Sequence, residues 1–368
     1  MKIIHVVGAR PNFMKIAPVM QEMANHPNEF EQMLVHTGQH YDAQMSEIFF
    51  NELELPRPNI NLEVGSGSHA IQTARIMERF ESIILDHQPD WIMVPGDVNS
   101  TMACTLVASK LGVKVAHLEA GLRSFDRSMP EEINRLVTDQ LADLLLTPSR
   151  DGDENLLREG IAPKKIHFVG NVMIDTLVRL RPKSEERWPA LQANYGLDQF
   201  VLATLHRPGN VDEAERLRTL IEALEHIASH CMVLFPVHPR TRQRMAKLGI
   251  EPQSANFQLI QPLGYLDFLA LQAHARLVLT DSGGVQEETT YLGTPCFTVR
   301  PNTERPVTIT HGTNQLIQND REVLVKSILD RLNEVKQEDA SQASCPDRWD
   351  GCAAARVVDV MRSSDTIG

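Results

Sequence analysis

Short apolar runs rich in β-branched residues alternate with amphipathic stretches along most of the chain. A first series of runs predicts strands over residues 3–7, 91–94, 113–117 and 144–147. A second series predicts strands over residues 200–205, 232–237, 257–260, 277–280 and 296–299. Apolar residues at spacings of three and four predict helices over residues 71–85, 213–228 and 323–335. Strands that alternate with crossover helices are typical of parallel sheets covered on both faces.

The two series of strands lie on either side of a stretch rich in proline and charge at residues 181–189. We therefore predict an α/β protein with two Rossmann-like, doubly wound domains that face each other across a central cleft. The N-terminal domain is expected over residues 1–169 and the C-terminal domain over residues 170–350, with a hinge near Gly170 and residues 181–189. A helical pattern at residues 353–362 is a candidate to complete the N-terminal domain.

Length, charge and cysteine content exclude several classes of protein. The chain has 368 residues, which favours two domains, and its formal net charge of −12 argues against broad electrostatic binding of nucleic acid or an anionic membrane. No apolar run approaches the ~18–20 residues of a membrane-spanning helix, and the N-terminus lacks a signal-peptide pattern, so we expect a cytoplasmic protein. Five cysteines without a Cys-x-x-Cys pair indicate neither a disulfide framework nor a zinc site.

The first predicted strand ends in a turn that carries candidate anion-binding groups. Gly8 is followed by Arg10 and Lys15, and the apolar periodicity after them predicts a helix. A strand-to-helix turn at the carboxyl edge of a parallel sheet is where ligands commonly bind, with helix amides and cations facing an anion. In the alternative interpretation, Gly8 only makes a turn and both cations are solvated. The dinucleotide and Walker glycine motifs are absent.

Three acids follow other strand ends of the N-terminal half. Asp97 and Glu119 each come just after a predicted strand, and Glu131 opens a predicted helix. Asp97 is in a position where aspartate commonly caps a helix, and Glu131 and Glu132 also suit the positive end of a helix, so structural roles are the first interpretation. Acids gathered at one sheet edge nevertheless suit a general acid and a general base.

The C-terminal half carries histidines and a glycine-rich turn at its strand ends. His206 and His238 follow two predicted strands, which favours a site that binds phosphate or titrates near neutral pH. Ser282, Gly283 and Gly284 lead directly into a predicted helix, so backbone amides and the helix dipole predict an anion site there. A plain glycine-rich turn is the alternative.

Together these motifs resemble those of the non-hydrolysing UDP-N-acetylglucosamine 2-epimerases. The resemblance extends from residue 2 to about residue 314 and rests on the order of these segments: residues 8–15, 37–40, 96–97, 117–123, 130–135, 206–207, 281–288 and 303–306. It implies the two-domain fold shared with a large class of glycosyltransferases (GT-B-like), a UDP-sugar substrate, a homodimer, and neither a metal nor another cofactor. The implied reaction removes the C2 proton, eliminates UDP, and adds UDP back with protonation on the opposite face.

The resemblance also assigns roles to residues of this chain. It implies that the catalytic groups are Asp97, Glu119, Glu131 and His206. It implies that the substrate-binding groups are Arg10, Lys15, Gln39, His40, Arg135, His238, Ser282, Gly283, Gly284, Glu288 and Arg305. Which acid removes the C2 proton is left open.

Three alternatives stay open on the sequence alone. The form of residues 96–101, and Asn12-Phe13 after Pro11, also occur in relatives that act on other UDP-2-acetamido sugars, such as UDP-2,3-diacetamido uronic acids. The same fold could serve a glycosyltransferase, although no basic amphipathic stretch for a lipid acceptor is present. A catalytically silent UDP-sugar sensor is disfavoured by the three intact acids.

Overall fold

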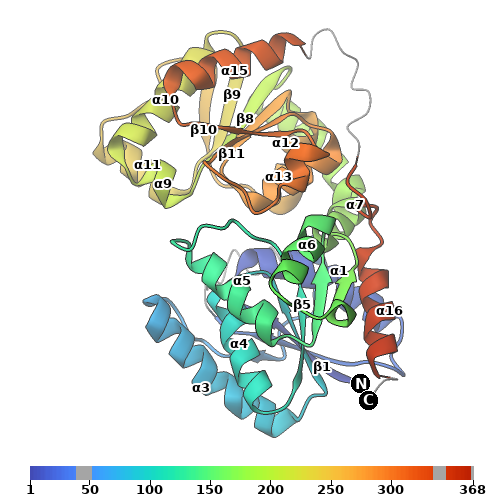
Figure 1. Cartoon of the computed structure of the whole chain (residues 1–368). Coiled ribbons are helices and arrows are strands. Elements are labelled where there is room, and N and C mark those ends of the chain that lie inside the picture. The colour runs from blue at the N-terminus through green and yellow to red at the C-terminus, as the bar shows by residue number, and fades with distance from the viewer. Residues whose placement is uncertain (39–51, 335–344, 366–368) are drawn as a thin grey trace. The chain divides into compact units, whose positions relative to one another are not determined.

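The computed structural model describes residues 1–38, 52–334 and 345–365 of the chain. Contacts within the chain divide it into two compact units. The first unit comprises Met1–Arg179 and Asp347–Gly368, and the second comprises Leu180–Pro346. Each unit is built around one parallel sheet (Figure 1).

The sheet of the first unit has seven strands in the order β3-β2-β1-β4-β5-β6-β7. Their bounds are β1 Lys2–Val7, β2 Glu31–His36, β3 Ile60–Asn61, β4 Trp91–Pro95, β5 Lys114–Leu118, β6 Leu144–Thr147 and β7 Ile166–Phe168. All neighbouring strands pair in parallel. The strand order reverses between β1 and β4, and ligands of such sheets bind outside the carboxyl ends of the strands at this reversal.

Helices of the first unit pack against this sheet and contribute side chains to its apolar core. They are α1 Arg10–Ala24, α3 His69–His87, α4 Asn99–Lys110, α5 Pro130–Leu141, α6 Arg150–Arg158 and α7 Val172–Glu185, with a 3-10 turn at Pro163–Lys165. In α3 the buried residues Gln72, Ile76, Phe80 and Ile84 recur every four positions, so one stripe of the helix packs into the core. Helix α7 continues from the first unit into the second.

The C-terminal helix α16 (Ala353–Asp365) packs against α1 in the first unit (Figure 1). Its first backbone amides, those of Ala353 and Ala354, donate to the Asp175 carboxylate over 3.1 and 2.6 Å. Just before it, the indole nitrogen of Trp349 donates to the carbonyl of Pro148 over 3.0 Å. The end of the described chain is thereby anchored to elements that precede residue 180.

The sheet of the second unit has six parallel strands in the order β10-β9-β8-β11-β12-β13. Their bounds are β8 Phe200–Thr204, β9 Met232–Pro236, β10 Phe257–Ile260, β11 Leu277–Thr280, β12 Cys296–Val299 and β13 Asn314–Ile317. The helices are α8 Trp188–Tyr195, α9 Pro208–Val211, α10 Ala214–Ala228, α11 Pro239–Lys247, α12 Tyr265–His274, α13 Gly283–Leu292, α14 Val307–Thr310 and α15 Arg321–Glu334.

Alternate residues of β8 enter different apolar clusters, which shows that both faces of this sheet are covered. Val201 and Ala203 pack in a cluster with residues of α10 and α15, whereas Phe200 and Leu202 pack with residues of α8 and α12. The order of strands again reverses, here between β8 and β11. The predicted α/β fold with two doubly wound units is therefore confirmed.

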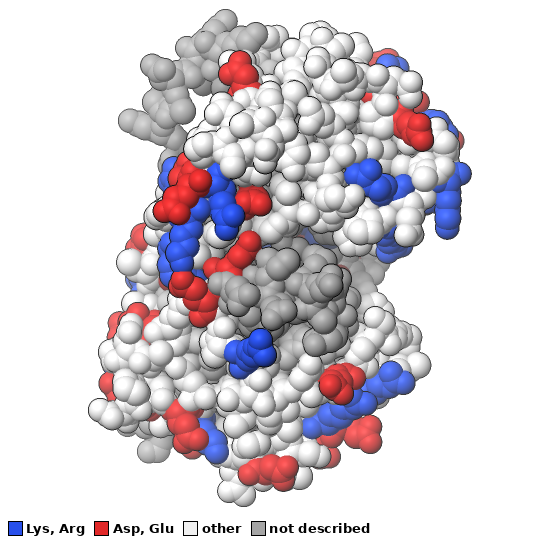
Figure 2. Space-filling model, turned by 180° about the vertical axis from the view of Figure 1, so that it is seen from behind, with Lys and Arg blue, Asp and Glu red and all other residues white. Residues whose placement is uncertain are grey.

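The described surface carries both signs of charge. On the face shown in Figure 2, many basic side chains lie close to acidic ones. Arg179 pairs with Glu54, for example, and Arg362 pairs with Glu29. None of the described helices is both long and apolar enough to cross a membrane.

Candidate active site

The turn between β1 and α1 is fixed by Asn12 and by the close approach of α4. The Asn12 side chain accepts hydrogen bonds from the amides of Gly8 and Ala9 over 3.1 and 2.9 Å and donates to the carbonyl of Pro95 over 2.9 Å. A Cβ on Gly8 would lie 2.2 Å from the Ser100 hydroxyl oxygen, so only glycine fits. Helix α1 thus begins at the carboxyl edge of the sheet, as the sequence predicts.

Lys15, one turn into α1, is buried against Glu119. The ammonium and the carboxylate form an ion pair, and the residues are only 6% and 7% exposed. Predicted site residues from the ends of β1 and β5 therefore meet at one edge of the sheet. Helix α1 begins at Arg10, whose side chain is outside the described part of the structure, as are Gln39 and His40.

Glu119 has a strained backbone. Its φ of +73° is in the left-handed region, which costs a residue other than glycine about 1–3 kcal/mol. The conformation is held because the amides of Glu119 and Ala120 both donate to the carbonyl of Leu146, over 3.0 and 3.1 Å. Such strain is frequent at functional sites, and here it turns the Glu119 carboxylate toward Lys15.

Asp97 lies at the corresponding end of β4, beside α5. Its carboxylate accepts from Arg135 Nη1 over 2.5 Å, and its carbonyl accepts from Asn134 Nδ2 over 2.8 Å. The interpretation of Asp97 as a helix cap is wrong, because α4 begins at Asn99 and its N-cap position is Val98. The carboxylate is instead drawn to Arg135 and stays partly exposed.

The two glutamates at the start of α5 have different environments. Glu132 is buried, and its carboxylate accepts from the amides of Ser124 and Phe125 over 3.0 and 2.9 Å and from Arg135 Nη2 over 2.8 Å. Burial opposes ionisation of Glu132, but these hydrogen bonds and the Arg135 charge hold its pKa below the usual range. Glu131 is exposed. Glu132 therefore orders the preceding loop and Arg135, whereas Glu131 is available to a ligand.

A buried polar network lies behind these acids. His117 Nδ1 is 2.6 Å from Asp139 Oδ1, and His117 Nε2 is 2.8 Å from the carbonyl oxygen of Gly96. The other Asp139 oxygen accepts from the amide of Gly121 over 3.2 Å and pairs with Arg123 Nη1 at 2.7 Å. Burial alone would raise the pKa of Asp139, but His117 and Arg123 lower it overall. Asp139 belongs to none of the predicted site motifs, although its position four residues after Arg135 places it on the same side of α5.

In the second unit, His206 and Asp281 form a pair at the ends of β8 and β11. His206 Nδ1 is 3.0 Å from Asp281 Oδ1, and the histidine side chain is 52% exposed. Asp281 is buried and also accepts from the amides of His206 and Arg207 and from Asn210 Nδ2. Burial would raise the pKa of Asp281, but these donors lower it. Asp281 orients His206 and leaves Nε2 as the ring nitrogen for a ligand.

His238 caps a helix in the structure. Its side chain accepts from the amide of Arg240 over 3.3 Å at the start of α11. Burial, together with the charges of His206 and Arg240, lowers the pKa of His238 and favours its neutral form. His238 and His206 thus lie near each other after the neighbouring strands β9 and β8.

The turn between β11 and α13 presents free helix amides. Ser282 is the N-cap residue of α13, but its side chain makes no capping hydrogen bond, so the first amides of the helix are available to an anion. A Cβ on Gly283 would lie 2.6 Å from Arg305 Nη1 and 2.9 Å from Glu304 Oε1. Gly283 is therefore required by the close approach of this ion pair.

Arg305 is held by two carboxylates of the second unit. Its Nε is 2.8 Å from Glu287 Oε1, and its Nη1 pairs with Glu304. Glu304 also accepts from Arg300 Nη2 over 2.7 Å, and the two guanidinium groups overcome burial and hold the pKa of Glu304 far below its usual range. Glu288 is buried and accepts from Gln272 Nε2 over 2.6 Å.

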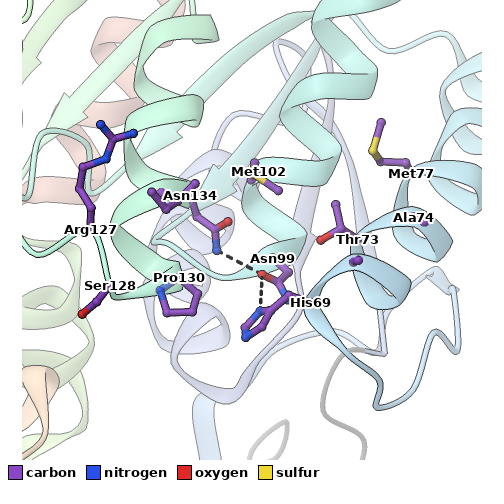
Figure 3. Close-up of a pocket in the computed structure, with 12 residues that line it drawn as sticks. His69, Thr73, Ala74, Met77, Asn99, Met102, Arg127, Ser128, Pro130 and Asn134 are labelled. Atoms are coloured by element: carbon purple, nitrogen blue, oxygen red, sulfur yellow. Dashed lines mark hydrogen bonds between the residues drawn. The ribbon is translucent and has the colours of Figure 1, made fainter.

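A pocket of about 630 Å³ lies beside the acids of the first unit, between α3, α4 and α5. Figure 3 shows Asn99 at its polar end, between His69 and Asn134. Asn134 also donates to the carbonyl of Asp97, so this pocket shares one side chain with the Asp97 turn. Its apolar lining comes from Ala70, Ala74, Met77, Met102, Pro130 and Ile133.

Comparisons with known proteins identify the family. The sequence profile of the UDP-N-acetylglucosamine 2-epimerase family matches residues 21–362. A UDP-N-acetylglucosamine 2-epimerase homolog of Methanococcus maripaludis is 44% identical over 99% of this chain and all of that protein. The UDP-2,3-diacetamido-2,3-dideoxy-D-glucuronate 2-epimerase of Pseudomonas aeruginosa is 43% identical over 92% of this chain and 94% of that protein.

A solved structure shows the same likeness at the level of the fold. The UDP-GlcNAc 2-epimerase of Methanocaldococcus jannaschii, in complex with UDP-GlcNAc and UDP, superimposes with a TM-score of 0.88 at 38% identity. The match covers 99% of this chain and all of that one. With the family profile and these relatives agreeing over nearly its full length, the chain belongs to the UDP-N-acetylglucosamine 2-epimerase family.

Proposed function

We propose that the protein interconverts UDP-N-acetylglucosamine and UDP-N-acetylmannosamine by inversion at C2. The observation that carries this proposal is the group of acids at the carboxyl edge of the first sheet, where Glu119 pairs with Lys15 and Asp97 pairs with Arg135. The names of the relatives, and the UDP-GlcNAc and UDP bound in the archaeal structure, support a UDP-sugar as substrate.

The chemistry assigns different tasks to the two units. The C2 proton beside an acetamido group is very weakly acidic, so its removal needs a carboxylate base and a stabilised leaving group. We assign proton removal and return to Asp97, Glu119 and Glu131 of the first unit. We assign binding of the leaving UDP to the α13 amides at Ser282, Gly283 and Gly284.

The remaining predicted residues have supporting tasks in this proposal. His206, oriented by Asp281, would hold or protonate an oxygen of the diphosphate through Nε2. Arg135 and Lys15 lie beside their carboxylate partners, and we assign to these cations stabilisation of the negative charge that builds up during elimination. Sugar and nucleotide contacts are assigned to Arg10, Gln39, His40, His238, Glu288 and Arg305.

A second candidate substrate is a UDP-2,3-diacetamido uronic acid. The relative named for that substrate is 43% identical to this chain, whereas two archaeal relatives named for UDP-N-acetylglucosamine are each 41% identical. Both sugars carry the same acetamido group at C2, so the same acids would serve either one. The two proposals differ in what must recognise C3 and C6 of the sugar.

Product analysis separates these proposals. Purified protein is incubated with each UDP-sugar in turn, and the products are resolved by chromatography and NMR, with Glu119→Gln as the inactive control. A UDP-N-acetylmannosamine product from UDP-N-acetylglucosamine supports the first proposal. Turnover of the uronic acid alone supports the second, and transfer of the sugar to an acceptor, or no change with either substrate, contradicts both.

We also propose that the protein is a cytoplasmic homodimer. Cys104 and Cys296 are buried and form no disulfide, which suits a reducing compartment. Helix α3 exposes the apolar side chains of Ile71 and Leu85, which suits contact with a second copy. Light scattering of the purified protein tests the dimer, and a monomer at micromolar concentration would contradict it.

A further inference from the structure

The buried Asp139 of α5 touches two segments that lead to catalytic acids. One carboxylate oxygen is 2.6 Å from His117 Nδ1. The other ring nitrogen of His117 contacts the carbonyl of Gly96, which is next to Asp97. The other oxygen accepts from the amide of Gly121, two residues after Glu119. His117 and Asp139 are both 0% exposed. The Asp139 side chain thus connects the turn that carries Asp97 with the turn that carries Glu119.

The hydrogen-bond partners fix the protons on His117. The carbonyl oxygen of Gly96 can only accept, so His117 Nε2 must carry a proton. The other Asp139 oxygen accepts from the amide of Gly121 and pairs with the Arg123 guanidinium, and both contacts favour the ionised carboxylate. An ionised carboxylate can only accept, so His117 Nδ1 must carry a proton as well. Two protonated ring nitrogens make His117 an imidazolium.

The position of Gly96 shows why this contact matters for the site. Gly96 has a φ of +67°, and a Cβ there would lie 2.8 Å from Lys15 Nζ and 3.7 Å from Glu119 Oε2. The peptide that His117 holds is therefore packed directly against the Lys15–Glu119 pair. A shift of the Gly96 peptide would displace Asp97 and at the same time press on Glu119. A misplacement of about 1 Å can cost an enzyme on the order of 10²-fold in rate.

We propose that Asp139 and His117 are positioning residues, and that a buried imidazolium held by Asp139 sets the turns of Asp97 and Glu119 relative to each other. Asp139 is on the same helix as Glu131 and Arg135, eight residues after Glu131. Helix α5 thereby fixes the relative positions of Asp97, Glu119 and Glu131. This inference rests on the proposed epimerase function for its effect on turnover, whereas the charge of His117 does not depend on it.

The first experiment measures the protons on His117 directly. Protein labelled with 15N in its histidine rings is studied by NMR at neutral pH, and His117→Gln identifies the His117 signals. We expect both ring nitrogens to carry a proton. His5 is the matched control, because it is equally buried in strand β1 of the same sheet, but burial lowers its pKa to about 4 and keeps it neutral. A neutral ring at His117 would overturn the proposal.

The second experiment tests the positioning role with Asp139→Asn. The asparagine has the same shape, but its amino group must face either His117 or the donors Gly121 and Arg123, so one contact is lost. We expect kcat to fall about 10²-fold, with the dissociation constant for UDP within threefold of wild type, since UDP binding is assigned to α13. Thr138→Val is the control, because this buried neighbour on α5 has a hydroxyl without a hydrogen-bond partner among the described residues.

Each outcome of this second experiment is informative. Unchanged kcat in Asp139→Asn, or an equal loss in Thr138→Val, would overturn the positioning role. If Asp139→Asn fails to fold, His117→Gln provides the same comparison, because glutamine can donate to Gly96 but carries no charge. If wild-type protein fails to epimerise either UDP-sugar, the proposed function is wrong, while the NMR result on His117 still stands or falls by itself.

Discussion

The buried ion pair between Lys15 and Glu119 predicts a specific separation of stability from activity. Lys15→Met leaves the Glu119 carboxylate without its ammonium, and Glu119→Gln leaves Lys15 without its carboxylate. Because the residues are 6% and 7% exposed, water compensates little for the lost partner. Removing one member of a buried pair typically costs about 3–5 kcal/mol of the free energy of unfolding, whereas replacing both is often nearly neutral.

We therefore expect each single variant to be destabilised by about 3 kcal/mol or more and the double variant to be more stable than either one. All three are expected to lose turnover by about 10²–10⁴, because the double variant restores packing but no proton transfer. Stability is followed by hydrogen exchange of β4 and β5 amides, which reports on the first unit alone, and turnover by product analysis.

Two results would contradict these expectations for the Lys15–Glu119 pair. If the losses of the single variants simply add in the double variant, the two charges are not coupled as a buried pair. If the double variant retains turnover near wild type, Glu119 takes no part in catalysis. The comparison thus tests the structural and the catalytic interpretation of the same contact separately.

Much of the fold follows from the sequence because the central strands are buried on both faces. The predicted runs at residues 91–94 and 277–280 correspond to β4 and β11, every residue of which is buried. The apolar pattern does not predict β2, because this strand lies toward the sheet edge and begins with the polar residues Glu31 and Gln32. Strand β13 is not predicted either, because it is short and includes the exposed Gln315.

The candidate site was predictable in part for a similar reason. The carboxyl ends of parallel strands share one edge, so the meeting of Lys15 with Glu119 follows from the order of elements. The orientation of α5 does not follow from a motif, and it decides that Glu132 is buried and Glu131 exposed. Asp139 is distant in sequence from His117, and only the spacing of Glu132, Arg135 and Asp139 along one face of α5 signals that they act together.

Further predictions test other parts of the molecule. Glu131→Gln is expected to lower turnover by about 10²–10⁴ while leaving unfolding unchanged, whereas Glu132→Gln should lower thermal stability as well; similar behaviour of the two variants would contradict the separation of their roles. Gly283→Val is expected to weaken UDP binding in calorimetry at least tenfold, because the side chain would collide with a buried ion pair, and Gly209→Ala, which meets open space, should bind normally. Burial lowers the pKa of His5 from 6.5 to about 4, so below pH 6.5 the unfolded chain takes up a proton that the folded protein does not bind. The free energy of unfolding is therefore expected to fall by about 3 kcal/mol as the pH falls from 6.5 toward 4. His5→Gln should flatten this part of the stability profile in urea titrations, and an unchanged acid limb would show that His5 is not responsible.

We assign to carboxylates of the first unit the transfer of a proton at C2 of the sugar, and solvent exchange at C2 measures this transfer. The protein is incubated with UDP-N-acetylglucosamine in heavy water, and C2 of both UDP-sugars is examined by NMR and mass spectrometry. We expect deuterium at C2 of the epimer and, as the reaction reverses, at C2 of the remaining substrate, with no incorporation by Asp97→Asn or Glu119→Gln. An epimer that retains protium at C2, or incorporation that persists in both variants, would contradict this assignment.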